Sequence, residues 1–149
     1  MPTAIKSDKI ELSSEKKTEE FACKFLKKIK PGCSVFLYGE IGVGKTTFIR
    51  YLINKFQKIN KLEITEVTSP TFNLLNEYQI NEFKINHYDL FRLKSVEETK
   101  NLNLFDDSKN TINLIEWPQM VKEKPKNLIE LVFEYGKDHK TRFVQIKGL

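Results

Sequence analysis

A glycine-rich segment constrains this chain more than any other feature. Residues 39–46 read G-E-I-G-V-G-K-T and match the phosphate-loop pattern G-x-x-x-x-G-K-[ST]. Glycines let the backbone curl closely around an anion, so that several N–H groups converge on the phosphates. The spacing predicts that Lys45 reaches the β- and γ-phosphates and that the Thr46 hydroxyl binds Mg²⁺. The predicted nucleotide-binding residues of this segment are Gly39, Gly42, Val43, Gly44, Lys45, Thr46 and Thr47.

The segments on either side agree with this interpretation. Residues 34–38 form a short apolar run typical of a buried strand, and residues 46–56 carry apolar side chains at helical spacing. The N-terminus of that helix would direct its dipole and free N–H groups at the bound anion. Strand, glycine loop and helix follow one another as the fold of a P-loop nucleotide-binding protein requires.

The rest of the chain alternates between strand-like and helix-like segments. Ser13 or Ser14 is expected to cap a helix that reaches Ile29 and ends before Pro31-Gly32, and Ser95 to cap another through Leu104. Strands are expected at 9–12, 72–80, 82–88, 111–115, 127–135 and 141–147, with 72–80 and 82–88 as a hairpin. The predicted fold class is α/β, a single P-loop NTPase domain over residues 1–149, with three α/β/α layers and a mixed central sheet.

Composition bears on the cellular location and on the kind of partner. With 40% hydrophobic and 30% charged residues, no apolar run of membrane-spanning length and no signal-peptide core, the chain is expected in the cytoplasm, without membrane contact. Cys23 and Cys33 are then expected to be reduced thiols. The net charge is +5, but among the 25 basic residues only Arg50, Arg92 and Arg142 are arginines. This lysine-rich surface fits either an RNA partner or ordinary solvation.

Three polar segments beyond the loop have both a structural and a functional interpretation. The turn at 68–72 is either a simple turn with Phe72 in the core, or a switch that brings the Thr71 hydroxyl to the γ-phosphate or its Mg²⁺. Asp89 ends a predicted strand, where nucleotide sites place a Mg²⁺-directed carboxylate; it is otherwise a loop residue. His87 beside it is more typical of a structural histidine than of a catalytic one.

Glu116 and Trp117 close the predicted strand 111–115. Glu116 could orient the attacking water or hold Mg²⁺, directly or through water, and Trp117 could pack over the nucleotide or contact a partner. The structural alternative is a strand-end glutamate and a partly buried tryptophan. Lys140 and Arg142, in the last predicted hairpin, could contact the nucleotide or be surface charges.

Taken together, four motifs resemble those of the bacterial TsaE (YjeE) family. They are the phosphate loop, continued by Thr47 and Phe48; S-P-T-F at 69–72; H-Y-D-L-F-R-L at 87–93; and E-W-P-Q at 116–119. The order matches that family, and the set is far more specific than a phosphate loop alone. Phe91 departs from the family's usual tyrosine, but no phosphate or metal ligand is missing.

The resemblance implies an ATPase that supports formation of threonylcarbamoyladenosine in tRNA, at the adenosine next to the anticodon. It would act on the TsaD–TsaB complex, touch tRNA only indirectly or weakly, and have no DNA partner. By position, Lys45, Thr71, Asp89 and Glu116 would be the catalytic residues. Thr46, Asp89 and Glu116 would be the metal ligands, and Trp117 would lie by the nucleotide. The implied cofactors are ATP and Mg²⁺, with slow hydrolysis in the absence of partners.

The residues also bear on three other functions that P-loop proteins have. A GTPase is disfavoured because the chain has no N-K-x-D guanine-reading segment. A small P-loop kinase would need an arginine-rich lid, which three arginines can hardly build. A nucleotide-gated binding module, in which ATP mainly orders the switch segment for docking, differs from the ATPase only in degree of turnover.

Overall fold

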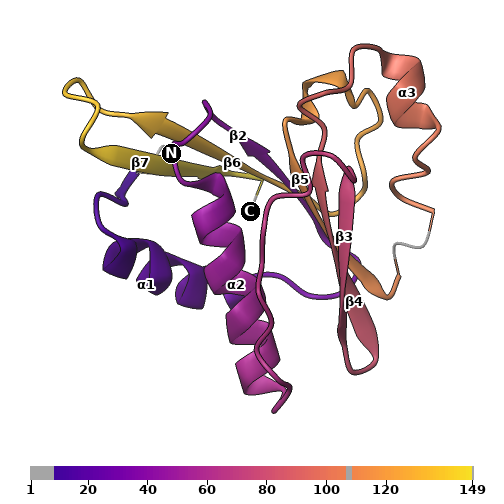
Figure 1. The fold of residues 1–149 in the computed structure, drawn as a ribbon, viewed down its shortest axis with the longest axis horizontal. Coiled ribbons are helices and arrows are strands. Elements are labelled where there is room, and N and C mark those ends of the chain that lie inside the picture. Colours follow the sequence, from indigo (N-terminus) through magenta and orange to yellow (C-terminus); the bar gives the residue numbers. More distant parts are fainter. Residues whose placement is uncertain (1–8, 107–108, 149) are drawn as a thin grey trace, which may run out of the picture.

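A mixed sheet of seven strands runs through the part of the chain that the computed structural model describes, residues 9–106 and 109–148 (Figure 1). The spatial order is β1-β7-β6-β2-β5-β4-β3, and the central strands β6, β2, β5 and β4 are parallel. The outer pairs β1–β7, β7–β6 and β4–β3 are antiparallel, which confirms the predicted mixed α/β fold. The strands are β1 Ile10–Glu11, β2 Ser34–Tyr38, β3 Leu75–Ile80, β4 Phe83–Asp89, β5 Thr111–Glu116, β6 Leu128–Tyr135 and β7 Arg142–Lys147.

The helices begin at the caps that the sequence predicts. Helix α1 spans Glu15–Leu26 and α3 spans Val96–Lys100, and the side chains of Ser14 and Ser95 accept backbone N–H groups of their first turns. Helix α2, Lys45–Ile59, starts directly after the phosphate loop, and a short 3₁₀ turn, η2, covers Pro118–Met120. Among the described residues, no helix combines the length and the apolar character that crossing a bilayer requires.

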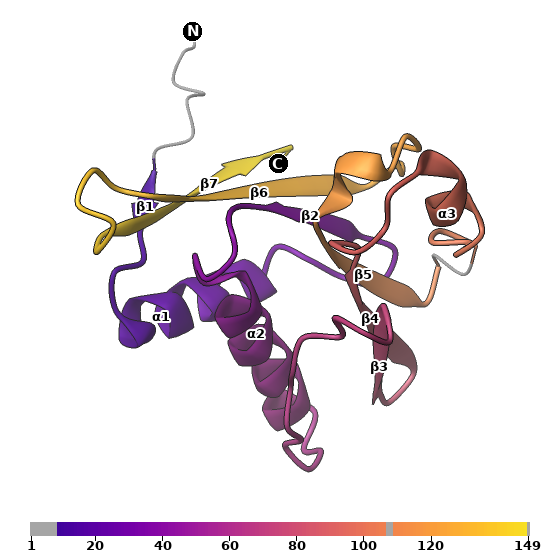
Figure 2. The same cartoon turned by 45° about the horizontal axis from the view of Figure 1, so that its top comes forward.

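The sheet has a different cover on each face (Figures 1 and 2). Because side chains alternate along a strand, the strands present one set of apolar residues to each side. Helices α1 and α2 pack together on one face over a large core that includes Phe25, Phe48 and Leu114. On the other face, the segment around α3 and η2 covers a smaller core built on Phe36 and Ile115. These layers agree with the expected α/β/α arrangement, although the α3 layer is mostly turns.

Several predicted boundaries are wrong, including the end of α2, which extends to Ile59 instead of the expected Phe56. The strand expected from residue 72 begins only at Leu75, since Leu74 adopts a left-handed conformation with φ of 68°. The helix expected through Leu104 ends at Lys100, and Asn103, with φ of 51°, turns the chain so that Leu104 still reaches the smaller core. Helix α1 ends at Leu26, before Ile29, which is nevertheless buried. The expected absence of a signal-peptide core concerns residues 1–8, which lie outside the described residues.

The parallel strands bring distant segments to one edge of the sheet. Glu116 of β5 lies in register with Leu37 of β2 on one side and with Asp89 of β4 on the other. The phosphate loop leaves the same end of β2. Two carboxylates from separate segments therefore stand beside the loop, as carboxyl ends of neighbouring parallel strands do in α/β proteins.

Candidate functional site

The phosphate loop is built on glycines with positive φ. Gly39, Gly42 and Gly44 have φ of 149°, 83° and 115°, a region that residues with a Cβ rarely adopt. A Cβ on Gly39 would lie 2.9 Å from the carbonyl oxygen of Phe133, so the loop also packs tightly against β6. Gly44 is the residue before α2, whose free N–H groups therefore open into the loop. The Val43 side chain lies in the large core, which anchors the loop from beneath.

Lys45 is a nearly buried cation, with 4% of its surface exposed. Its Nζ donates a hydrogen bond to the carbonyl oxygen of Gly39 and lies 3.8 Å from the centre of the Trp117 ring. Burial lowers the pKa of Lys45, while the nearby carboxylates of Glu116 and Asp89 oppose that shift. The ammonium group is thus held inside the loop by a carbonyl, an aromatic face and two negative charges.

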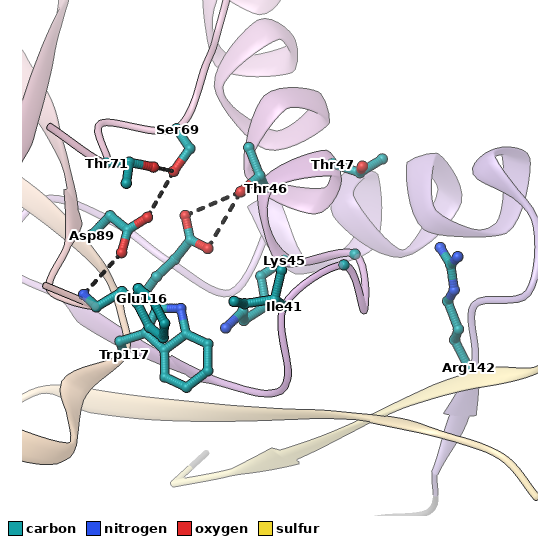
Figure 3. Close-up of a pocket in the computed structure, with 13 residues that line it drawn as sticks. Ile41, Lys45, Thr46, Thr47, Ser69, Thr71, Asp89, Glu116, Trp117 and Arg142 are labelled. Carbon is teal, nitrogen blue, oxygen red and sulfur yellow. Dashed lines mark hydrogen bonds between the residues drawn. The ribbon is translucent and has the colours of Figure 1, made fainter. Parts of the chain in front are cut away.

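Glu116 is the most strongly held carboxylate of the site (Figure 3). Only 3% of it is exposed. His87 Nε2 lies 2.6 Å from its Oε2, and the Thr46 hydroxyl donates to the carboxylate at 3.3 Å from each oxygen. His87 is fully buried, and its Nδ1 has no hydrogen-bond partner among the described residues, which favours the tautomer with the proton on Nε2. His87 is therefore structural in the sense that it orients Glu116.

Asp89 is held by a different set of groups. The Ser69 hydroxyl donates to its Oδ2 at 2.7 Å, and the Phe91 amide donates to its Oδ1 at 3.1 Å. Ser69 Oγ also lies 3.2 Å from Thr71 Oγ1, so Ser69 connects Thr71 to the carboxylate (Figure 3). The sequence prediction named Thr71 and passed over Ser69. The signal for Ser69 was its place at the start of the S-P-T-F motif, two residues before Thr71.

Two aromatic side chains, Phe91 and Trp117, line the site, whereas Phe72 does not. Trp117 has a left-handed backbone, with φ of 57°, and its ring packs on Phe91 with ring centres 4.8 Å apart. Phe72 is 82% exposed, with the Arg92 guanidinium over its ring. The interpretation of Phe72 as a core residue is therefore wrong.

These groups surround one cavity of about 390 Å³. Nine of the predicted site residues line it, whereas Gly39 and Val43 do not. Ile41, Ser69 and Phe91, which were not in the predicted set, also line it, as does Arg142, which the sequence offered either as a nucleotide contact or as a surface charge. The full lining is Ile41, Gly42, Gly44, Lys45, Thr46, Thr47, Ser69, Thr71, Asp89, Phe91, Glu116, Trp117 and Arg142.

A second cavity, of about 230 Å³, adjoins the first across the phosphate loop. The two share Gly44, Thr47 and Arg142. The rest of the second cavity comes mainly from the start of α1 and from the β6–β7 hairpin. Its other lining residues are Leu12, Ser13, Ser14, Glu15, Thr18, Val43 and Lys140.

The oxygen atoms around Thr46 suit a hard cation. Thr46, Asp89 and Glu116 offer one hydroxyl and two carboxylates, the ligand chemistry that Mg²⁺ prefers. Within residues 9–106 and 109–148, no group of three or more His, Cys, Asp or Glu side chains could hold a metal alone. The set therefore fits Mg²⁺ that is shared with phosphate oxygens and water better than a metal caged by protein alone.

Comparisons with known proteins agree on one family. A family model described as "Threonylcarbamoyl adenosine biosynthesis protein TsaE" matches residues 12–144. The TsaE protein of Rickettsia bellii is 42% identical over 130 residues, which cover 87% of this chain and 88% of the relative. The TsaE protein of a Nostoc species is 32% identical over 134 residues, with 86% and 78% covered.

A solved structure supports the fold. The crystal structure of Bacillus subtilis YdiB superposes with a TM-score of 0.69 over 97% of this chain and 87% of the other. At 20% sequence identity this likeness concerns the arrangement of helices and strands alone.

Proposed function

Because this chain belongs to the TsaE family of tRNA threonylcarbamoyladenosine biosynthesis proteins, we propose that it is a Mg²⁺-dependent ATPase of this pathway. Hydrolysis would be slow in the isolated protein and would sustain the turnover of the TsaD–TsaB complex. That complex would modify the adenosine next to the anticodon, and this chain would touch tRNA indirectly or weakly. The place of action is then the cytoplasm.

One observation carries the ATPase proposal. Around the ammonium group of Lys45, the protein gathers the Thr46 hydroxyl and the Asp89 and Glu116 carboxylates from three separate segments. A phosphate loop alone would support binding. The carboxylates at one end of it support a reaction at the terminal phosphate.

Each group of site residues would have its own role in ATP hydrolysis. Loop amides and Lys45 would bind the β- and γ-phosphates, with Lys45 moving from the Gly39 carbonyl to phosphate oxygens. Thr46, with Asp89 and Glu116 directly or through water, would hold Mg²⁺, which neutralises charge on the phosphate oxygens when bound. Glu116, which His87 holds in place, would orient the attacking water and accept its proton.

The position of arginine supports slow hydrolysis without partners. Transition-state charge on the γ-phosphate is commonly stabilised by an arginine, supplied in cis or by a partner. Among the residues that the structure describes, a single arginine lines the cavity, Arg142, which lies across the phosphate loop from Glu116 and Asp89 (Figure 3). A partner that supplies a cation on the carboxylate side would complete the site.

The test separates ATP binding from the coupling of ATP hydrolysis to tRNA modification. Labelled ATP with Mg²⁺ should bind the wild-type protein, and Lys45→Ala should lower that affinity about 100-fold, since both charge and hydrogen bonds to phosphate are lost. Equal affinities would contradict nucleotide binding at this loop. Multiple-turnover formation of threonylcarbamoyladenosine with TsaD, TsaB and tRNA should then collapse for Asp89→Ala and Glu116→Ala.

A matched control uses an exposed glutamate. Glu63→Ala removes one carboxylate on the surface and should leave turnover unchanged. Full turnover with Asp89→Ala and Glu116→Ala, while ATP still binds, would instead favour a nucleotide-gated binding module. Transfer of labelled γ-phosphate to a small molecule, rather than release to water, would favour a kinase.

A further inference from the structure

Arg142 stands where the two cavities meet. It is the first residue of β7 and contributes to the walls of both cavities. Its Nη1 lies 4.0 Å from the position that a Cβ on Gly44 would occupy. The guanidinium therefore faces the last turn of the phosphate loop, at the point where α2 begins.

Neighbouring groups fix this side chain in place. The guanidinium carbon lies 5.8 Å from the centre of the Tyr135 ring, and the Tyr135 hydroxyl lies 3.3 Å from the Cβ position of Gly42. The backbone of Arg142 is also held, because its N–H donates to Ser13 Oγ at 3.2 Å and its carbonyl accepts from Leu12 at 2.7 Å. The Tyr135 side chain thus lies near both the cation and the loop, and substitution of the Arg142 side chain should leave the strand pairing intact.

The guanidinium has no anionic partner among the described residues. No ion pair forms to Arg142 there, and its Nε is buried without a hydrogen-bond acceptor. A buried N–H without an acceptor is costly, and a guanidinium matches phosphate oxygens with paired N–H donors. An anion bound in the loop would supply that acceptor.

The layout of the site defines which phosphate is within reach. The carboxylates and Thr71 lie on one side of the loop and mark the γ-phosphate end; Arg142 and Thr47 lie on the other (Figure 3). A triphosphate that runs along the loop therefore brings its α-phosphate toward Arg142, and its nucleoside toward the second cavity. We propose that Arg142 binds the α-phosphate and strengthens nucleotide affinity without taking part in hydrolysis, an inference that rests on the proposed function.

This role predicts a specific pattern of losses. An α-phosphate contact is made equally in the ground state and the transition state, so it changes affinity but not the rate of the chemical step. Arg142→Ala should weaken binding of ATP and ADP by the same factor, about tenfold, as expected for one charge-assisted contact at a half-buried position. The single-turnover rate of ATP hydrolysis at saturating ATP, with TsaD–TsaB present, should not change.

The experiment measures affinities by calorimetry for ATP, ADP and inorganic triphosphate, each with Mg²⁺. Lys137→Ala is the matched control, because Lys137 is an exposed cation of the same hairpin that lines neither cavity. The expected result is an equal loss for all three ligands with Arg142→Ala, a smaller loss with Arg142→Lys and none with Lys137→Ala. Arg142→Gln, which keeps most of the stem, replaces Arg142→Ala if circular dichroism shows that the latter is unfolded.

Each other outcome overturns the proposal in a distinct way. A loss for ATP but not for ADP would place Arg142 at the γ-phosphate. A loss for both nucleotides but not for inorganic triphosphate would place it on the nucleoside. Equal nucleotide affinities of the wild type and the Arg142 variants would contradict the α-phosphate contact and leave the ATPase proposal intact. A wild-type protein that binds no ATP would contradict both the contact and the ATPase proposal.

Discussion

The two sides of the phosphate loop are built differently. On the carboxylate side, His87, Asp89 and Glu116 are almost fully buried, and hydrogen bonds from separate segments fix both carboxylates. On the arginine side, Arg142 is half-buried, and an open cavity of about 230 Å³ lies beside it. The same loop therefore separates a rigid, densely paired region from a loosely filled one.

This difference indicates a division of labour. Groups that must meet charge as it develops are most effective when they are held in place before the reaction. Groups that only hold the ligand can be fewer and more exposed, since they contribute equally before and during the reaction. Substitutions on the carboxylate side should therefore alter rates, and substitutions on the arginine side should alter affinities.

The largest effect is expected for Glu116→Gln. The amide keeps the size of the side chain but removes the charge that would orient water and accept its proton, so the single-turnover rate with TsaD–TsaB should fall about 100- to 1,000-fold. ATP affinity should change by less than about threefold, because the phosphate loop is intact. A variant that binds ATP as poorly as it hydrolyses it would break the proposed division.

A smaller loss, about tenfold in rate, is expected for His87→Leu, which removes the donor that orients Glu116 at 2.6 Å. His87→Gln offers an N–H group at a similar reach and should recover part of the rate. The comparison is made between rates at saturating ATP, with thermal unfolding measured for both variants. Equal rates for the Leu and Gln variants, at equal stability, would show that His87 only fills space.

The hydroxyls of Ser69 and Thr71 can be separated in the same way. Ser69→Ala removes the 2.7 Å hydrogen bond to Asp89 and should slow hydrolysis about three- to tenfold. Thr71→Val keeps the shape of the side chain and leaves that bond intact. If the Thr71 hydroxyl acts on the nucleotide, Thr71→Val should slow hydrolysis and leave the affinity for ADP at the wild-type value. If Thr71→Val leaves the hydrolysis rate unchanged, the switch role belongs to Ser69 alone.

The smallest effect on nucleotide chemistry is expected at Tyr38, which directly precedes the phosphate loop but packs its side chain against the smaller core on the other face of the sheet. Burial, and then the hydrogen bond to Glu130 at 2.8 Å, raise the pKa of Tyr38 to about 12 from its ordinary 10. Since the folded protein holds this proton more tightly than the unfolded chain, the contribution to stability is complete below about pH 10 and is lost as the pH rises toward 12.

Tyr38→Phe should therefore flatten part of the decline in unfolding free energy between pH 10 and 12, measured by urea denaturation. At neutral pH it should leave both ATP affinity and hydrolysis unchanged. A clear change in either would mean that the far face of the sheet couples to the loop.

The local features of this site could be predicted from the sequence, because each depends on a short segment. The strand at residues 34–38 and the glycine loop follow from apolar runs and from backbone conformations that glycine permits. The serine caps Ser14 and Ser95 follow from local hydrogen bonding. The ends of the predicted elements were less accurate where left-handed residues such as Leu74 and Asn103 interrupt an otherwise suitable pattern.

Contacts between distant segments could not be predicted in the same way. His87 and Glu116 are 29 positions apart, and only the register of β4 on β5 brings them together. Arg142 belongs to the predicted β6–β7 hairpin, but that hairpin lies beside the loop because β6 pairs with β2, a pairing that no local pattern specifies. The sequence therefore named the residue types of the site, whereas the sheet decides which of them touch.

The placement of Trp117 has a practical consequence. It is the chain's one tryptophan, and its ring lies 3.8 Å from the ammonium group of Lys45. Any occupant that draws Lys45 away from the ring changes the electric field at the indole, so the emission spectrum of the unlabelled protein would follow the occupant's arrival and departure in real time. The protein therefore contains an optical probe at the centre of its own site.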